Sequence, residues 1–185
     1  MRGSRALAVL AAVCLMGTLA GAVPATAEPY CGITWGSTAK TVVVQRSINT
    51  LYDVRAGRHD CYDRVVIELT EPGAQGFDVR YVDQVIDLGT GAPVPLRGGA
   101  RLRVSTAPAS VWSATGHLLY DPPNPAEAAD VRGFQTFRQI AFAGDDNNVG
   151  LFGLGVRARL PFRAFWLDGD EHTTQRLVVD VAHQW

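Results

Sequence analysis

The sequence predicts an all-β fold, a single antiparallel β-sandwich of about seven to nine short strands. Short stretches rich in β-branched and aromatic residues recur along the chain, several of them with a period of two. Turns rich in Gly, Pro, Asn and Asp separate these stretches. No stretch of helical periodicity is capped at both ends, and no internal repeat is present, so neither a helical bundle nor a repeat fold is expected.

The clearest strand covers residues 64–70, where Val65, Ile67 and Leu69 lie on one face of a period-two pattern. A loop-like segment, residues 28–40, begins the chain after the N-terminal signal. Residues 107–130 hold four prolines and no sustained period, and they form the longest irregular connection. Residues 41–46 are β-branched and are expected to pair at an edge, and residues 48–56 alternate loosely and lead into a polar turn. The other stretches expected to form strands are residues 77–86, 101–105, 135–143, 149–156, 161–167 and 177–182.

The first 27 residues resemble an export signal that is cleaved after Ala27. Two arginines precede an apolar stretch at residues 6–20, and residues 25–27 match the A-x-A cleavage pattern. The apolar stretch is shorter than the ~20 residues of a spanning helix. Cys14 lies deep inside it, where lipidation is not expected. We therefore expect a secreted or cell-wall-associated protein with one mature domain, residues 28–185, and no transmembrane segment.

The net charge of the mature chain limits the classes of partner that can be expected, and its cysteine content limits the roles of the cysteines. Removal of Arg2 and Arg5 changes the formal net charge from −1 to −3, so no net basic charge points to nucleic acid. Two cysteines remain, Cys31 and Cys61, and an even pair in an exported protein is typical of a disulfide. A metal pair or a nucleophile is the alternative, but no C-x-x-C spacing supports a metal site.

Charged and aromatic side chains gather in a polar turn at residues 57–63. The simplest interpretation is that Asp63 and Arg64 organise this turn by hydrogen bonds and a local ion pair, worth about 1 kcal/mol if exposed. Trp112 lies in the long irregular connection and is the best candidate for a surface tryptophan, whereas Trp166 is expected in the core. The candidates for ligand binding are Arg55, His59, Asp63, Arg64 and Trp112.

Other motifs do not predict catalytic, cofactor or metal residues. The glycines at residues 150–155 fit neither a dinucleotide nor a phosphate loop, and they indicate a bulge or a close approach of backbone. The GDDNN run at residues 144–148 lacks calcium-loop spacing and is expected to be an ordinary turn. The chain has no G-x-S-x-G or H-E-x-x-H motif, so a hydrolase would have to combine His59 with Asp60 or Asp63.

Motifs along nearly the whole mature chain resemble the AMIN-like domain of actinobacterial secreted proteins and lipoproteins. They begin with WGS-x-x-K at residues 35–40 and R-x-G-x-H-D-x-x-DRVV at residues 55–66. They continue with VRYVDQV, VPLRGGARLRV, FAGDDNNVGLFGLGV, PFRAFWLDG and RLVVDVAH, which ends at His183. The resemblance implies a small sandwich related to AMIN domains, which are non-catalytic modules associated with peptidoglycan binding and localisation in the envelope. The chain departs from many such relatives because it has no usable lipobox.

These observations favour a secreted, non-catalytic cell-envelope module that binds peptidoglycan or another cell-wall glycan. A secreted protein-interaction or inhibitor-like domain is the alternative. A hydrolase built on His59 is a third hypothesis, and it requires the imidazole to meet another His or carboxylate in a pocket. No cofactor is expected.

Overall fold

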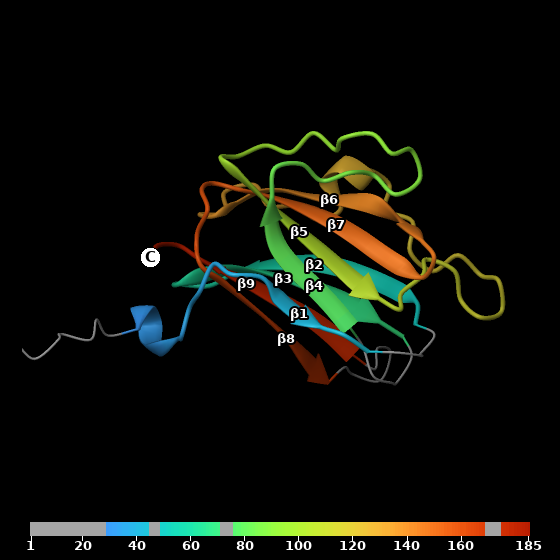
Figure 1. Ribbon diagram of the computed structural model, residues 1–185, viewed down its shortest axis with the longest axis horizontal. Helices are drawn as coiled ribbons and strands as arrows, with labels where there is room; N and C mark the ends of the chain where they lie inside the picture. Colours follow the sequence, from blue (N-terminus) through green and yellow to red (C-terminus); the bar gives the residue numbers. More distant parts are fainter. Residues whose placement is uncertain (1–28, 45–48, 71–75, 169–174) are drawn as a thin grey trace, which may run out of the picture.

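The computed structural model describes residues 29–44, 49–70, 76–168 and 175–185 of the chain. In these ranges it shows nine strands that form two antiparallel sheets, packed face to face (Figure 1). The predicted all-β sandwich is therefore confirmed. The predicted export signal, residues 1–27, lies outside the described residues.

One sheet has five strands in the order β1-β4-β5-β7-β6, and the other has four in the order β2-β3-β9-β8. Strands far apart in sequence are neighbours in both sheets; β3, for example, lies between β2 and β9. Two short 3-10 helices, η1 (Tyr30–Gly32) and η2 (Pro125–Glu127), lie in connections. The strands are β1 (Lys40–Val42), β2 (Leu51–Arg58), β3 (Tyr62–Leu69), β4 (Gly76–Val82), β5 (Ala100–Ala107), β6 (Phe137–Asp146), β7 (Val149–Val156), β8 (Phe162–Asp168) and β9 (Gln175–Ala182).

Two predicted turns are shorter than expected because the strand ladders continue into them. Arg58 pairs with Asp63, so only three residues separate β2 from β3, and Asp63 belongs to a strand. Similarly, β6 includes the two aspartates of the GDDNN run. Only Asn147 and Asn148 form that turn, with φ of 50° and 60°. Positive φ at both central residues is the requirement of a tight hairpin turn whose twist matches the strands. The first strand ends at Val42, earlier than predicted.

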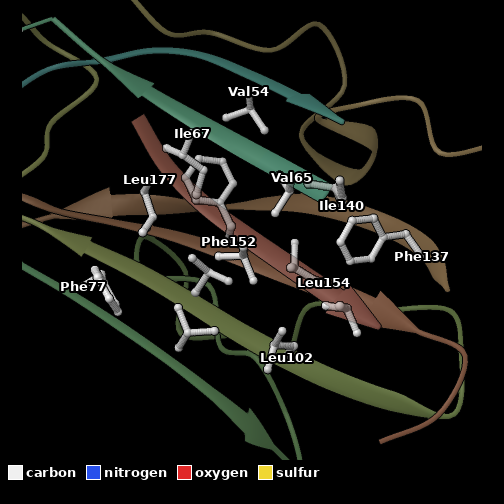
Figure 2. Packing of buried hydrophobic residues seen from close by; sticks show 14 of the residues in the cluster. Val54, Val65, Ile67, Phe77, Leu102, Phe137, Ile140, Phe152, Leu154 and Leu177 are labelled. Atoms are coloured by element: carbon white, nitrogen blue, oxygen red, sulfur yellow. The ribbon is translucent and has the colours of Figure 1, made fainter. Parts of the chain in front are cut away.

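The core lies between the sheets, where the inward side chains of alternate residues meet (Figure 2). Ile67 and Leu177 from the four-stranded sheet and Phe152 and Leu154 from the five-stranded sheet are fully buried. Trp166 packs against this cluster, as predicted. Full burial of one such side chain contributes roughly 1.5–3 kcal/mol to the free energy of folding. Because the period-two pattern of the strands determines which side chains are buried, it is the main determinant of the fold.

The glycine-rich run forms β7, which lies between β5 and the edge strand β6 of the five-stranded sheet. A Cβ atom at Gly155 would lie only 2.1 Å from the carbonyl oxygen of Arg97 in the preceding loop. Glycine is therefore required there for a close approach of backbone, as the sequence indicated.

The N-terminal segment is fastened to the four-stranded sheet. Cys31 is joined to Cys61 in the turn between β2 and β3, which confirms the predicted disulfide. Gly36 forms an isolated bridge with Phe162 at the start of β8. The same segment supplies Lys40, the first residue of β1, so it connects the two sheets along one side of the sandwich (Figure 1). Within the described ranges, no helix is long and apolar enough to cross a bilayer.

Candidate binding groove on the outer face of the four-stranded sheet

The outer face of the β2-β3-β9-β8 sheet carries a regular grid of side chains. Successive residues of a strand point to opposite faces, so the register of the ladders determines which outward residues are neighbours. Each row takes one residue from each strand in sheet order. The three rows are Gly57, Arg64, Asp180 and Arg163; Arg55, Val66, Val178 and Phe165; and Asp53, Glu68, Arg176 and Leu167.

Asp180 is the centre of an ion cluster in the first row. Its carboxylate is fully buried, although it lies on the outer face, because two arginine side chains cover it. Arg64 donates from Nε to Oδ1 at 2.6 Å and from Nη2 to Oδ2 at 2.9 Å, and Arg163 donates from Nε to Oδ2 at 2.8 Å. The hydrogen bonds with Asp180 raise the pKa of the Arg64 guanidinium above its ordinary value and outweigh the opposing effect of burial. One carboxylate thus holds two cations in place.

Aromatic rings stack on these guanidinium groups. The Arg163 guanidinium lies 5.5 Å from the ring centre of Trp35, 5.4 Å from that of Tyr62 and 5.0 Å from that of Phe165. His59 stacks on Tyr62 with the ring centres 4.5 Å apart. Cation–π contacts of this kind contribute about 0.5–1 kcal/mol each at exposed sites, and they restrict the rotamers of both partners.

A groove of about 220 Å³ runs across this grid. Its floor is apolar, because Val66 and Val178 are 7% and 1% exposed. Arg55, whose side chain is half exposed, donates from Nε to the buried Glu68 carboxylate at 2.6 Å. None of the described lining residues is acidic. The lining residues are Arg55, Ala56, Gly57, His59, Arg64, Val66, Leu167, Arg176 and Val178.

Three of the five candidate residues meet at this groove: Arg55, His59 and Arg64. Trp112 does not. It is 52% exposed at the other end of the molecule, where a backbone bridge joins it to Leu118 and its carbonyl accepts from Thr50 beside the start of β2. The eight residues of β2 separate that end from the turn that holds His59, a distance of roughly 25 Å.

Asp63 points to the opposite face of the sheet from Arg64, and the expected local ion pair between them is wrong. Adjacent residues of a strand face opposite ways, and once β3 begins at Tyr62 the Asp63 side chain is directed inward. Its Oδ2 atom accepts hydrogen bonds from the backbone N–H groups of Thr136, at 2.5 Å, and Phe137, at 2.9 Å. Asp63 therefore attaches the segment before β6 to β3.

His183 completes the surroundings of Asp63 in a second, polar cavity of about 460 Å³. Its Nε2 atom lies 3.1 Å from Asp63 Oδ1, and its Nδ1 atom lies 3.2 Å from the carbonyl oxygen of Asp60. Both ring nitrogens thus face oxygen atoms of the protein. A histidine that exchanges a proton with a substrate needs a nitrogen directed at that substrate. This arrangement therefore favours a positioning role for the His183–Asp63 pair.

A third cavity, of about 440 Å³, lies beside β6 and also has a basic rim. Its arginines stabilise the surrounding loop: Arg138 donates to the carbonyls of Phe134, Gln135 and Phe137, and Arg97 donates to the carbonyl of Arg138. Among the residues that the structure describes, no group of three or more His, Cys, Asp or Glu side chains is placed to hold a metal ion.

Comparison with known protein families identifies the domain. A family model for the AMIN-like domain matches residues 49–183, which is well over half of the chain. The chain belongs to the AMIN-like domain family. The matched range of the AMIN-like domain includes every residue that lines the groove, but it begins after the motif at residues 35–40 and after Cys31. A comparison with curated proteins finds no match.

Sequence reasoning missed the part of the AMIN-like domain groove that β8 and β9 contribute. Arg163, Arg176 and Asp180 lie about 100 residues or more from the polar turn. Arg163 and Asp180 occur in the predicted strands at residues 161–167 and 177–182, and Arg176 lies just before the second of them. The alternating pattern of the sequence could have shown that these three charged residues lie on the outer face of their strands. Alternation alone places them on one face but does not place them beside Arg64.

Proposed function

We propose that this AMIN-like domain is a secreted, non-catalytic module of the cell envelope, and that it binds peptidoglycan or another cell-wall glycan through the groove on the outer face of the β2-β3-β9-β8 sheet. The carrying observation is the groove itself. It combines an apolar floor with arginine side chains that are already held by Asp180 and Glu68. Membership of the AMIN-like domain family supports a role in the envelope.

The composition of the groove supports binding of a polymer of sugars and peptides. Aromatic and guanidinium groups beside the groove offer flat surfaces and hydrogen-bond donors, which is the combination that polar, ring-containing ligands need. The rings of Tyr62 and Phe165 and the guanidinium of Arg163 extend this surface across the sheet. In the cavity beside Asp63, both ring nitrogens of His183 face oxygen atoms of the protein, which supports a structural role for that histidine.

Sedimentation of the mature domain with purified cell wall tests this proposal. We expect the protein to sediment with the wall, and we expect the double variant Arg55→Gln/Arg176→Gln to remain mostly in the supernatant. Arg132→Gln is the matched control, because the Arg132 side chain is 92% exposed and pairs with the exposed Asp130 in its own loop. Sedimentation no greater than that of serum albumin, or equal sedimentation of all variants, contradicts the proposed role of the groove.

The exported state is part of the same proposal. An N-terminal sequence that begins at Glu28 in protein recovered from the culture medium or the wall fraction supports it. Protein that keeps its first 27 residues in the cytoplasm contradicts it.

A second candidate function is a protein-interaction or inhibitor-like domain, and one observation favours it. The loop after β5 forms a small hairpin in which Trp112 and Leu118 are 52% and 44% exposed. Backbone bonds from Ser113 N to His117 O and from Leu119 N to Val111 O hold this hairpin. Tryptophan is enriched among the residues that dominate binding at protein interfaces. If this function holds, Trp112→Ala abolishes capture of a specific partner and leaves wall binding unchanged.

A further inference from the structure

The groove on the outer sheet face has a chemical preference that goes beyond the binding of a wall polymer. We infer that it receives a free carboxylate carried on a short aliphatic body. In a peptidoglycan ligand this group belongs to the peptide stem rather than to the sugar backbone. The inference rests on the proposed function and names the part of the ligand that the groove contacts.

The outer sheet face carries an excess of positive charge. Four arginines lie in the grid, Arg55, Arg64, Arg163 and Arg176, whereas the carboxylates bonded to them there are Glu68 and Asp180. The grid also holds Asp53, so the difference is one positive charge (four arginines minus three carboxylates) on a chain whose formal net charge is −1. Asp53 lies at the edge of the grid and does not line the groove. An anionic group that enters the groove therefore meets an uncompensated positive field.

The arginine donors of the groove are held in fixed orientations. Arg176 lines the groove and donates from Nε to the carbonyl of Asp168 at 2.9 Å, which restricts the orientation of its guanidinium. Arg55 and Arg64 are oriented in the same way by Glu68 and Asp180. Planar guanidinium groups with fixed orientation bind carboxylates through paired N–H donors more strongly than neutral donors do. A neutral sugar hydroxyl cannot accept such a paired, charged hydrogen bond.

The shape and polarity of the groove suit a small ligand with an aliphatic part. Val66 and Val178 form an apolar floor directly beside the arginines, which suits a carboxylate attached to a small aliphatic group such as the methyl of alanine. Gly57 leaves one end open, since the nearest atom to a Cβ built there is His59 Nε2 at 3.8 Å. The volume of about 220 Å³ is below the roughly 300–1,000 Å³ of pockets that enclose drug-sized molecules. The groove therefore suits one residue rather than a disaccharide.

Calorimetric titration with three small ligands tests this inference. They are N-acetyl-dialanine with D-configuration and a free carboxylate, the same peptide as its C-terminal amide, and inorganic phosphate. We expect saturable binding of the acid, at least ten-fold weaker binding of the amide, and no saturable binding of phosphate, which lacks the aliphatic part. Equal affinity for acid and amide overturns the inference, and so does phosphate that competes with the acid.

Two kinds of variant separate charge from shape. Arg176→Gln removes one cation and is expected to weaken binding of the acid about ten-fold, as for loss of a charged hydrogen bond. Gly57→Val keeps every charge but fills the open end of the groove, and it is expected to abolish binding. Arg132→Gln is the control with full affinity. Melting curves of each variant exclude unfolding as the cause, and full affinity in Gly57→Val overturns the inference.

The outcomes also separate this inference from the proposed function. Wall sedimentation that persists when the wall carboxylates are amidated refutes the carboxylate preference and leaves the envelope role intact. Binding of the free acid without any sedimentation with whole wall refutes the envelope role and leaves the chemical preference intact.

Discussion

Replacement of Asp180 by Asn is the sharpest test of how the outer sheet face is held together. The Asp180 carboxylate is fully buried, and the Arg64 and Arg163 side chains that cover it are 22% and 32% exposed. The substitution keeps the shape but removes the charge, and it turns an amide N–H₂ group toward two cations. Breaking a buried pair on one side costs about 3–5 kcal/mol. Because water still reaches both arginines, we expect a smaller loss of about 2–4 kcal/mol in the free energy of unfolding.

Urea unfolding monitored by tryptophan fluorescence measures this loss. For a domain of this size a loss of about 3 kcal/mol corresponds to a decrease of roughly 6–12 °C in Tm. The control is Asp130→Asn, whose partner Arg132 is 92% exposed, and a change within about 0.5 kcal/mol is expected there. A loss below about 1 kcal/mol for Asp180→Asn would falsify the argument that this buried carboxylate organises the two arginines.

Three further predictions concern other parts of the sandwich. Burial raises the pKa of Tyr81 to about 12. The stability that the neutral phenol contributes is therefore fully present below about pH 10 and is lost as the pH rises toward 12. In denaturant titrations, Tyr81→Phe should reduce the loss of unfolding free energy over this pH range. The double variant Cys31→Ser/Cys61→Ser opens a loop of 30 residues and should lower the free energy of unfolding by about 3–4 kcal/mol, and a loss below 1 kcal/mol contradicts the loop-closure argument. Gly155→Ala introduces a Cβ 2.1 Å from a backbone oxygen and should cost about 1–3 kcal/mol, whereas Gly57→Ala in an open site should change Tm little.

The architecture was predictable from the sequence because each strand is encoded locally. Val149–Val156 forms a strand over the range predicted, and Gln175–Ala182 begins only two residues earlier than predicted. The alternation of apolar and polar residues is a property of each strand alone, so a strand can be predicted without knowledge of its partner strand. The ends of strands depend on the partner, and for this reason Asp63 and Asp146 were placed in turns although they lie in ladders.

The groove was only partly predictable because its geometry depends on register. The polar turn indicated Arg55, His59 and Arg64 from sequence proximity, and the structure brings these three together. Asp180 comes beside Arg64 because β9 pairs with β3 in one particular register. A slip of one residue would direct Asp180 into the core, and no local pattern reports that alignment.

The polar turn at residues 57–63 restrains one side of the groove. His59 lines the groove, and the following residues, Asp60 and Cys61, are held by His183 and by the disulfide to Cys31. Neither restraint occupies the groove. Side chains that are ordered before a ligand arrives lose less conformational entropy on binding, so each restraint increases affinity without a contact of its own. Reduction of the disulfide should therefore weaken ligand binding at temperatures where the domain remains folded.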